Sequence, residues 1–328
     1  MVNQYYGLKL QELCEAKEIT KNEIIKKTGI PKSSLSRFFS GEGYLNLDQI
    51  DALLEFLHLE LSEYDYYLNN FKHNFYEELF SKIDQAATNN NIEELKDIAW
   101  QCEQIGEHLI ALCAKARLEK LTENEVVELS SFILGIEIFS FYELLILSDT
   151  IEQFSSEMIK AIIQDLSHHH QRLANRTRYR KIICQIACRG AVTCIQEGKE
   201  KEAQECLALV KAYCHEKDAY SRLIYRFTKG YYCIFYGQGE ERLLGIESMK
   251  KVIEIFDWEG SINLAKTYQK LYDKYVKNYN FPQWLSDILG KDSIGIFFLC
   301  FRNRCYNKVK ETKIKTNEEK PMDKFASY

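Results

Sequence analysis

Apolar residues recur three and four residues apart along most of this chain, which is the spacing of one face of a helix. Leu10, Leu13 and Cys14 form a short stripe of this kind near the amino terminus. A longer stripe runs through Leu47, Ile50, Leu53, Leu54 and Leu57. Only 3 prolines interrupt 328 residues, whereas strong helix formers are abundant. The pattern predicts an all-α protein.

Between these two stripes, the sequence reads as two short helices joined by a turn. Thr20 followed by Glu23 is the signature of a capping box, which begins a helix. Gly29 can adopt the left-handed conformation that ends a helix, and Pro31 suits the first turn of the next one. This order is typical of a helix-turn-helix, whose second helix is presented to the DNA major groove.

Charge is divided within residues 1–68, which we expect to form a five-helix DNA-binding domain. Positions 20 to 40 hold a single acid and the five cations Lys21, Lys26, Lys27, Lys32 and Arg37. Positions 41 to 65 hold seven acids and no lysine or arginine. Because the whole chain has a formal net charge of −5, a nucleic-acid surface must be local. The division favours one basic face that meets phosphates.

Residues 71–290 are predicted to form a second domain of helices joined by short polar turns. Three segments, at residues 89–95, 197–203 and 237–243, each resemble a turn that opens a helix. The first two lie about three times ~36 residues apart, near the period of tetratricopeptide (TPR) helix pairs. Such pairs stack into a superhelix with a concave binding face. An irregular helical bundle is the alternative.

The remaining residues, 291–328, are expected to form a partly disordered tail. Ile294–Leu299 could be a terminal helix or strand that packs on the last repeat or on a partner subunit. From Lys308 onward the composition is rich in Lys, Glu, Thr and Asn, which is typical of disorder.

An acid-free span between Leu166 and Gln196 holds six cations, of which five are arginines. The planar guanidinium group suits carboxylates, so this span predicts a surface for an anionic ligand. Side chains at positions 185, 189, 192 and 196 share one helix face, and positions 225, 229, 232 and 236 form a comparable stripe. The two stripes could line a groove for an extended peptide. The candidate peptide-binding residues are Arg178, Gln185, Arg189, Tyr225, Lys229 and Tyr232.

Two alternatives to a peptide groove stay open at this point. Tyrosines at this spacing are often core residues rather than groove residues. The arginines could instead pair with acids of other helices, such as Glu157 or Asp165.

Catalysis, metal binding and membrane insertion find no support in the sequence. The 11 cysteines lack metal-ligand spacing, and only Cys184 and Cys188 lie one helical turn apart with no further partners. Buried free thiols in a reducing cytoplasm explain them better. No apolar run approaches the ~20 residues that cross a bilayer, and no secretory signal is evident. There is no phosphate loop and no nucleophile with its base. We expect a cytoplasmic protein, not an enzyme, without cofactor or metal.

The first unit resembles the lambda-repressor-like (Xre-type) helix-turn-helix, through Leu35–Phe38 and the turn at Gly41 and Glu42. Aligning Gly29 and Gly41 with the two turn glycines of that family implies that Lys32, Ser33 and Arg37 lie where the recognition helix contacts bases, with Ser36 as a further candidate. Among them Arg37 is the best base reader, because its guanidinium can pair bidentately with guanine. Lys21 matches a position that contacts backbone phosphate. The DNA-binding residues implied are Lys21, Lys32, Ser33, Ser36 and Arg37.

Three positions depart from that family pattern. Relatives often have an arginine in the first helix and a glutamate at the end of the recognition helix, where this chain has Cys14 and Phe39. Because apolar groups replace both members of the ion pair, no buried charge remains without its partner. Ile25 stands where a small alanine is common, so we expect the two helices to cross slightly farther apart.

Taken over its first 290 residues or so, the chain resembles the Rgg/GadR/MutR regulators, the PrgX-like proteins and the wider RRNPP group. The resemblance is carried by the same motif at residues 35–38 and 41–42 and, farther on, by segments such as 202–204 and 252–256. The resemblance implies a homodimeric transcription regulator that binds double-stranded DNA and a short imported signalling peptide, as in quorum sensing. Peptide binding in the TPR-like domain would change the spacing of the two DNA-reading heads or their ability to engage paired half-sites. The alternatives are a ligand-independent regulator that responds to a protein partner, and a repeat-domain scaffold for protein interactions.

Overall fold

The computed structural model describes residues 4–69, 75–168 and 175–277. All regular structure in these ranges is helical, with no strand among the described residues. The predicted all-α class is therefore confirmed. None of the helices in this part of the chain is both long enough and apolar enough to cross a membrane.

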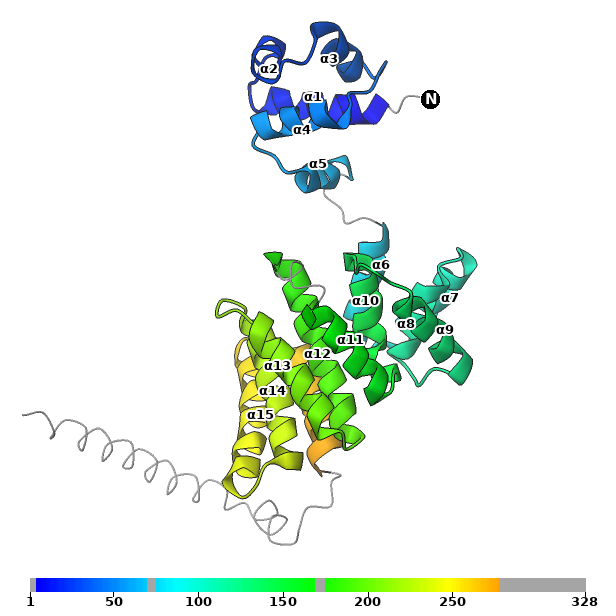
Figure 1. Cartoon of the computed structure of the whole chain (residues 1–328), viewed down its shortest axis with the longest axis vertical. Coiled ribbons are helices and arrows are strands. Elements are labelled where there is room, and N and C mark those ends of the chain that lie inside the picture. The colour runs from blue at the N-terminus through cyan, green and yellow to red at the C-terminus, as the bar shows by residue number, and fades with distance from the viewer. Residues whose placement is uncertain (1–3, 70–74, 169–174, 278–328) are drawn as a thin grey trace, which may run out of the picture. The chain divides into compact units, whose positions relative to one another are not determined.

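The amino-terminal part is a bundle of five helices (Figure 1). These are α1 (Gln4–Ala16), α2 (Lys21–Thr28), α3 (Lys32–Phe39), α4 (Leu47–Phe56) and α5 (Leu61–Leu68). Helix α1 packs against α3 and α5, and α2 packs against α3 and α4. The two predicted apolar stripes meet in one core, where Leu10 and Leu53 are fully buried together with Ile24, Leu35 and Phe38. The predicted five-helix domain is confirmed.

Local sequence chemistry fixes the turns of this bundle. The Thr20 hydroxyl accepts a hydrogen bond from the Glu23 amide, and the Glu23 carboxylate accepts one from the Thr20 amide, so the predicted capping box is present. Gly29 ends α2 at φ 70°, where its amide donates to the Ile25 carbonyl. Gly41, after α3, has φ 72°. Both values lie in the left-handed region that glycine adopts without strain.

Helices α1 and α3 approach each other closely at Gly7. A Cβ atom at Gly7 would lie only 1.7 Å from the carbonyl oxygen of Phe38. Only a residue without a side chain can occupy this position unless α1 and α3 move apart. Gly7 thus sets how closely α3, which carries the predicted recognition residues, is held on α1.

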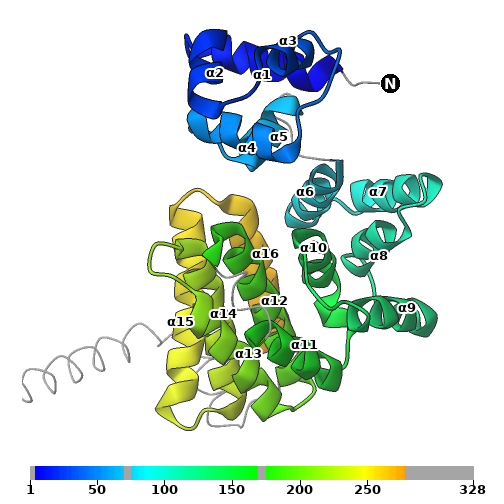
Figure 2. The same ribbon diagram turned by 45° about the horizontal axis from the view of Figure 1, so that its top comes forward.

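The helical hairpins of the second part follow one another along the chain (Figure 2). Consecutive helices pack as neighbours in the pairs α7 and α8, α12 and α13, and α14 and α15. Three of the helices begin in the three predicted turn segments, and the TPR-like repeat architecture is confirmed. The helices are α6 (Phe75–Thr88), α7 (Ile92–Gln104), α8 (His108–Ala116), α9 (Glu123–Leu134), α10 (Phe141–Thr150), α11 (Ser156–His168), α12 (Thr177–Gln196), α13 (Glu200–Tyr213), α14 (Ala219–Tyr236), α15 (Glu240–Trp258) and α16 (Ile262–Tyr272), with a 3-10 turn at Ile151–Gln153 and a π-helical turn at Asp273–Lys277.

Two contacts define how these helices are arranged. The backbones of α14 and α15 touch where Gly230 faces Gly245, because a Cβ at either glycine would lie 2.6 Å from the carbonyl oxygen of the other. The amide of Asn263, on α16, donates to Asn89 in the turn after α6, with 2.7 Å between nitrogen and oxygen. This bond brings α16 beside the turn between α6 and α7, so helices distant in sequence lie close in space.

The nine cysteines within the described residues are free thiols, and seven of them are buried. This confirms the predicted role of the cysteines as small core residues for that part of the chain. The predictions for Ile294–Leu299 and for the disordered tail lie outside the described residues. The boundaries 1–68, 71–290 and 291–328 stay predictions.

Candidate functional sites

Helix α3 separates its buried and exposed residues onto opposite faces. Leu35, Phe38 and Phe39 are buried in the core of the bundle. The exposed residues lie at Lys32 and at one, four and five residues after it, a spacing that places them on one face of the helix. They are Lys32, Ser33, Ser36 and Arg37. The structure thus brings four of the five predicted DNA-binding residues together on one exposed surface.

Arg37 lies at the end of this surface and is positioned by the turn that follows α3. Its main-chain carbonyl accepts hydrogen bonds from the amides of Glu42 and Gly43, at 2.7 and 3.1 Å. Its guanidinium Nη2 donates one long bond, of 3.4 Å, to the Glu42 carbonyl. Because the side chain is exposed and this bond is long, the planar fork can turn toward a base edge at small cost.

Lys21, the fifth predicted DNA-binding residue, lies at the first position of α2 and is exposed. Its Nζ lies 5.5 Å from the centroid of the Phe39 ring, within the range of a cation–π contact. The same ring and the Cys14 thiol are each only 2% exposed, in one core cluster. Burial raises the pKa of the Cys14 thiol to about 11. Both positions where the chain departs from the expected family pattern are therefore buried as apolar groups in the core of the bundle.

The six candidate peptide-binding residues do not form a single surface. Tyr232 is 7% exposed and packs toward α13, where its hydroxyl donates to Glu200 at 2.8 Å and accepts a bond from Gln204 at 2.6 Å. Lys229 lies with its Nζ 4.1 Å from the centroid of that ring. Burial raises the pKa of the half-buried Tyr225. These three side chains of α14 contribute to helix packing. This agrees with the alternative interpretation, in which tyrosines at this spacing are core residues rather than groove residues.

Arg178 and Arg189 on α12 are both paired with acids of other helices. Arg178 Nη1 lies 3.1 Å from Glu77, and its guanidinium carbon lies 4.4 Å from the centroid of the Phe141 ring. Arg189 Nε lies 3.1 Å from Glu152, and its Nη1 donates to the Ser148 carbonyl. The alternative of arginine–acid pairing thus holds at these two positions, although with partners other than Glu157 and Asp165. Because both cations are compensated, the expectation of an uncompensated basic surface is wrong for them.

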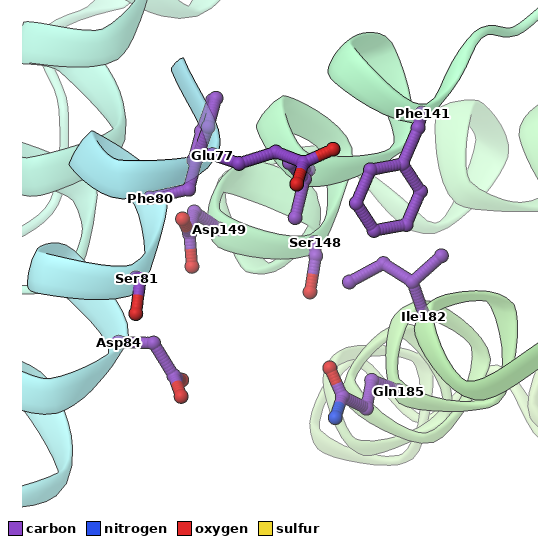
Figure 3. A pocket seen from close by; sticks show the side chains of 10 residues that line it. Glu77, Phe80, Ser81, Asp84, Phe141, Ser148, Asp149, Ile182 and Gln185 are labelled. Carbon is purple, nitrogen blue, oxygen red and sulfur yellow. The ribbon is translucent and has the colours of Figure 1, made fainter. Parts of the chain in front are cut away.

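A cavity of about 250 Å³ lies between α6, α10 and α12 (Figure 3). Of the six candidates only Gln185 lines it. The sequence contained a signal for the α10 side of this cavity. The last three residues of this largely apolar helix, 148 to 150, are polar, and all three are buried. The lining residues are Glu77, Phe80, Ser81, Asp84, Phe141, Leu145, Ser148, Asp149, Ile182 and Gln185.

Asp149 lies at the wall of this cavity and is 9% exposed. Its Oδ1 is 3.8 Å from Nη1 of Arg117 and 3.8 Å from Nη1 of Arg189. Burial outweighs the attraction of these two guanidinium groups and raises the pKa of Asp149 to about 6. The neighbouring positive charge of Arg189, followed by burial, lowers the pKa of Arg117. The cavity therefore borders a buried cluster of charges. No group of three or more metal-ligating side chains occurs within the described ranges.

Comparison with known proteins places both parts of the chain. Residues 67–270 match the C-terminal domain of the HTH-type transcriptional regulator Rgg, and residues 9–63 match a Cro/C1-type HTH DNA-binding domain. Among solved structures, the SHP pheromone receptor Rgg2 of Streptococcus dysgalactiae is 17% identical, with a TM-score of 0.65 over 83% of this chain and 100% of that one.

Two further structures share the fold at low sequence identity. PlcR of Bacillus thuringiensis, solved with the peptide PapR7 and DNA, is 13% identical, with a TM-score of 0.59 over 82% of this chain and 99% of that one. PrgX in its complex with cCF10 is 15% identical, with a TM-score of 0.59 over 85% of this chain and 94% of that one. The match to Rgg spans more than half of the chain. The chain therefore belongs to the Rgg family of HTH-type transcriptional regulators, which are DNA-binding proteins and not enzymes.

Proposed function

We propose that this chain is a homodimeric, cytoplasmic transcription regulator that binds double-stranded DNA through α3 and is controlled by a short signalling peptide bound in its repeat domain. The observation that carries the DNA part is the exposed face of α3, with Arg37 at its end. The cavity between α6, α10 and α12 supports the peptide part. Rgg2 is a pheromone receptor, and PlcR was solved with a peptide and DNA.

The proposed division of labour on DNA follows from side-chain chemistry. Arg37 reads a guanine through its bidentate fork, and Ser33 and Ser36 make less discriminating contacts to bases or phosphate. Lys32, at the amino end of α3, reaches the bases. Lys21, at the amino end of α2, contacts a phosphate, where the helix dipole also favours negative charge.

Dimerisation explains how a small basic face can give enough affinity for DNA. The cations of residues 20–40 are the local positive charge of an acidic chain, so one head neutralises only a few phosphates. Two heads joined by dimerised repeat domains double these contacts and read two half-sites. A peptide that changes the spacing of the heads then changes DNA affinity without touching DNA.

The cavity holds only part of a peptide. Its volume of about 250 Å³ is below the ≈ 300–1,000 Å³ of pockets that enclose a drug-sized molecule. We therefore propose that the cavity receives one anchoring group, while the remainder of the peptide extends along the repeat helices. The six candidate residues Arg178, Gln185, Arg189, Tyr225, Lys229 and Tyr232 stay proposals, and among them Gln185 has the best-supported position.

Selection experiments with the full-length chain test both halves of this proposal. Randomised DNA duplexes retained by the protein should converge on a paired, roughly palindromic site. Random heptapeptides retained by the protein should then shift its affinity for that site, measured by fluorescence anisotropy at fixed salt. Absence of a preferred duplex would overturn the DNA-reading part. Retention of no peptide, or of peptides without effect on DNA affinity, would overturn the control by a peptide.

A further inference from the structure

The cavity between α6, α10 and α12 is acidic, although the acid-free span supplies one of its walls. Its lining includes the carboxylates of Glu77, Asp84 and Asp149, and no lysine or arginine among the described lining residues. The sequence had suggested a surface for anions. The folded chain instead presents carboxylates, because α6 and α10 bring their acids to α12 across long stretches of sequence.

These three carboxylates differ in how well they are satisfied. Glu77 is held by Arg178 at 3.1 Å. Asp149 is nine-tenths buried, yet within the described residues it accepts no hydrogen bond, and its nearest cations are 3.8 Å away. Asp84 makes neither an ion pair nor a hydrogen bond with any residue that the structure describes. Two of the three carboxylates therefore have acceptor capacity left for a ligand.

The acids around the cavity outnumber the guanidinium groups by one, and Asp84 carries this additional negative charge. Arg117 and Arg189 face Asp149, and Arg189 also binds Glu152. Asp84 lies within electrostatic range of this cluster, where its charge opposes ionisation of Asp149. Two guanidinium groups thus balance two acids, and Asp84 adds a further negative charge. Asp84 is exposed, so its carboxylate is open to a group that arrives from solution, and a single cation would balance the charge of the cluster.

The shape of the site suits a cationic group of moderate size. Asp84 from α6, Ser148 from α10 and Gln185 from α12 point toward the same open space (Figure 3). The aromatic rings of Phe80 and Phe141 form part of the wall, and such rings attract cations. Arg178 already places its guanidinium over Phe141, which shows that this ring accepts a cation from outside the cavity.

We propose that this cavity binds one cationic group of the regulator's peptide ligand, with Asp84 as the charge partner and Asp149, Ser148 and Gln185 as further acceptors. The group is either the peptide's terminal ammonium or the side chain of a lysine or arginine. This rests on the proposed function, because the ligand is the signalling peptide of that proposal. The anchor fixes the register of the peptide, while its apolar remainder contributes contacts along the helices.

Two pools of random heptapeptides test this inference with the full-length protein. One pool has free amino termini and the other is acetylated, and retained peptides are identified by mass spectrometry. Retained peptides should be enriched in lysine or arginine in both pools when a side chain is the anchor. Loss of retention from the acetylated pool alone identifies the ammonium instead. Asp84→Asn should reduce either enrichment about tenfold, as expected for loss of one charge-assisted contact.

Glu78→Gln is the matched control, because it removes the same charge from the same helix at an exposed residue that pairs with Lys82 and does not line the cavity. It should leave the enrichment unchanged, and both variants should melt like the wild type by circular dichroism. Retained peptides without a preference for cations, equally retained by Asp84→Asn, would overturn this inference and leave the proposed function standing. Retention of no peptide by the wild type would overturn the proposed function itself.

Discussion

Arg117 and Arg189 approach the same carboxylate oxygen of Asp149 from two different helices, each at 3.8 Å. Arg117 caps the end of α8, and Arg189 lies in the middle of α12. Asp149, near the end of α10, therefore joins three helices through charge. The arrangement also holds two guanidinium groups close together, which only a shared acid makes tolerable. The floor of the proposed peptide site is thus part of the framework of the repeat domain.

Replacing Arg189 with alanine should destabilise the repeat domain. The substitution removes the bonds to Glu152 and to the Ser148 carbonyl and leaves Asp149 with Arg117 alone. Loss of one partner from a largely buried ion cluster costs about 2–3 kcal/mol, below the full range because the side chain keeps some exposure. Urea unfolding should show this loss, and Arg189→Lys should lose less because the charge remains.

Lys181→Ala, at an exposed position of the same helix, is the control and should change the free energy of unfolding by less than about 0.5 kcal/mol. If Arg189→Ala instead keeps its full stability and loses only peptide affinity, Arg189 is a binding residue rather than a structural one.

The stability of the chain should depend on pH through Asp149. Burial, against the pull of Arg117 and Arg189, raises the pKa of Asp149 from 3.8 to about 6 in the folded chain. Folding therefore favours the protonated form, so the stabilisation is complete below about pH 4 and is lost as the pH rises through about 6. The wild type should gain about 1 kcal/mol over Asp149→Asn between pH 7.5 and pH 5.

Urea unfolding of both proteins at the two pH values measures this difference, in which the other titrating groups cancel. A difference that does not change with pH would mean that the two guanidinium groups outweigh burial and that Asp149 stays ionised.

Gly7→Ala should destabilise the DNA-binding bundle, although alanine is the better helix former by about 1 kcal/mol. The new Cβ would lie 1.7 Å from the Phe38 carbonyl oxygen, and backbone atoms cannot rotate away. We expect a loss of about 2–3 kcal/mol, seen in thermal unfolding. Gly43→Ala is the control, because its Cβ would meet Arg37 side-chain atoms no closer than 3.5 Å. A stabilised Gly7→Ala variant would show that α1 and α3 separate easily.

The helix boundaries of the DNA-binding bundle could be predicted from sequence because they depend on short-range interactions. The capping box at Thr20 and the left-handed glycines 29 and 41 depend on residues within one turn of each other, so their patterns are visible in the sequence. Gly7 was missed because its requirement comes from a carbonyl 31 positions away, on another helix.

The repeat domain was predictable as helices but not as a site. The absence of acids between residues 166 and 196 described the local sequence correctly, yet the acids that pair with this span come from α6, α10 and the turn after α10. Sequence spacing orders residues along one helix and carries no information on which helices become neighbours. For this reason Gln185 was predicted, whereas Asp84 and Asp149 were not.

Arg37→Ala should weaken binding to the selected duplex by about 1–3 kcal/mol and relax the preference at one base position, because a bidentate contact to guanine is lost. The cost on the protein side is small, since Arg37 gives up only one long hydrogen bond to Glu42. Fluorescence anisotropy with the duplex and its single-base variants, at one salt concentration, measures both effects. Lys26→Ala, at an exposed position of α2, is the control and should weaken all duplexes alike. A uniform loss for Arg37→Ala would reassign Arg37 to a phosphate contact.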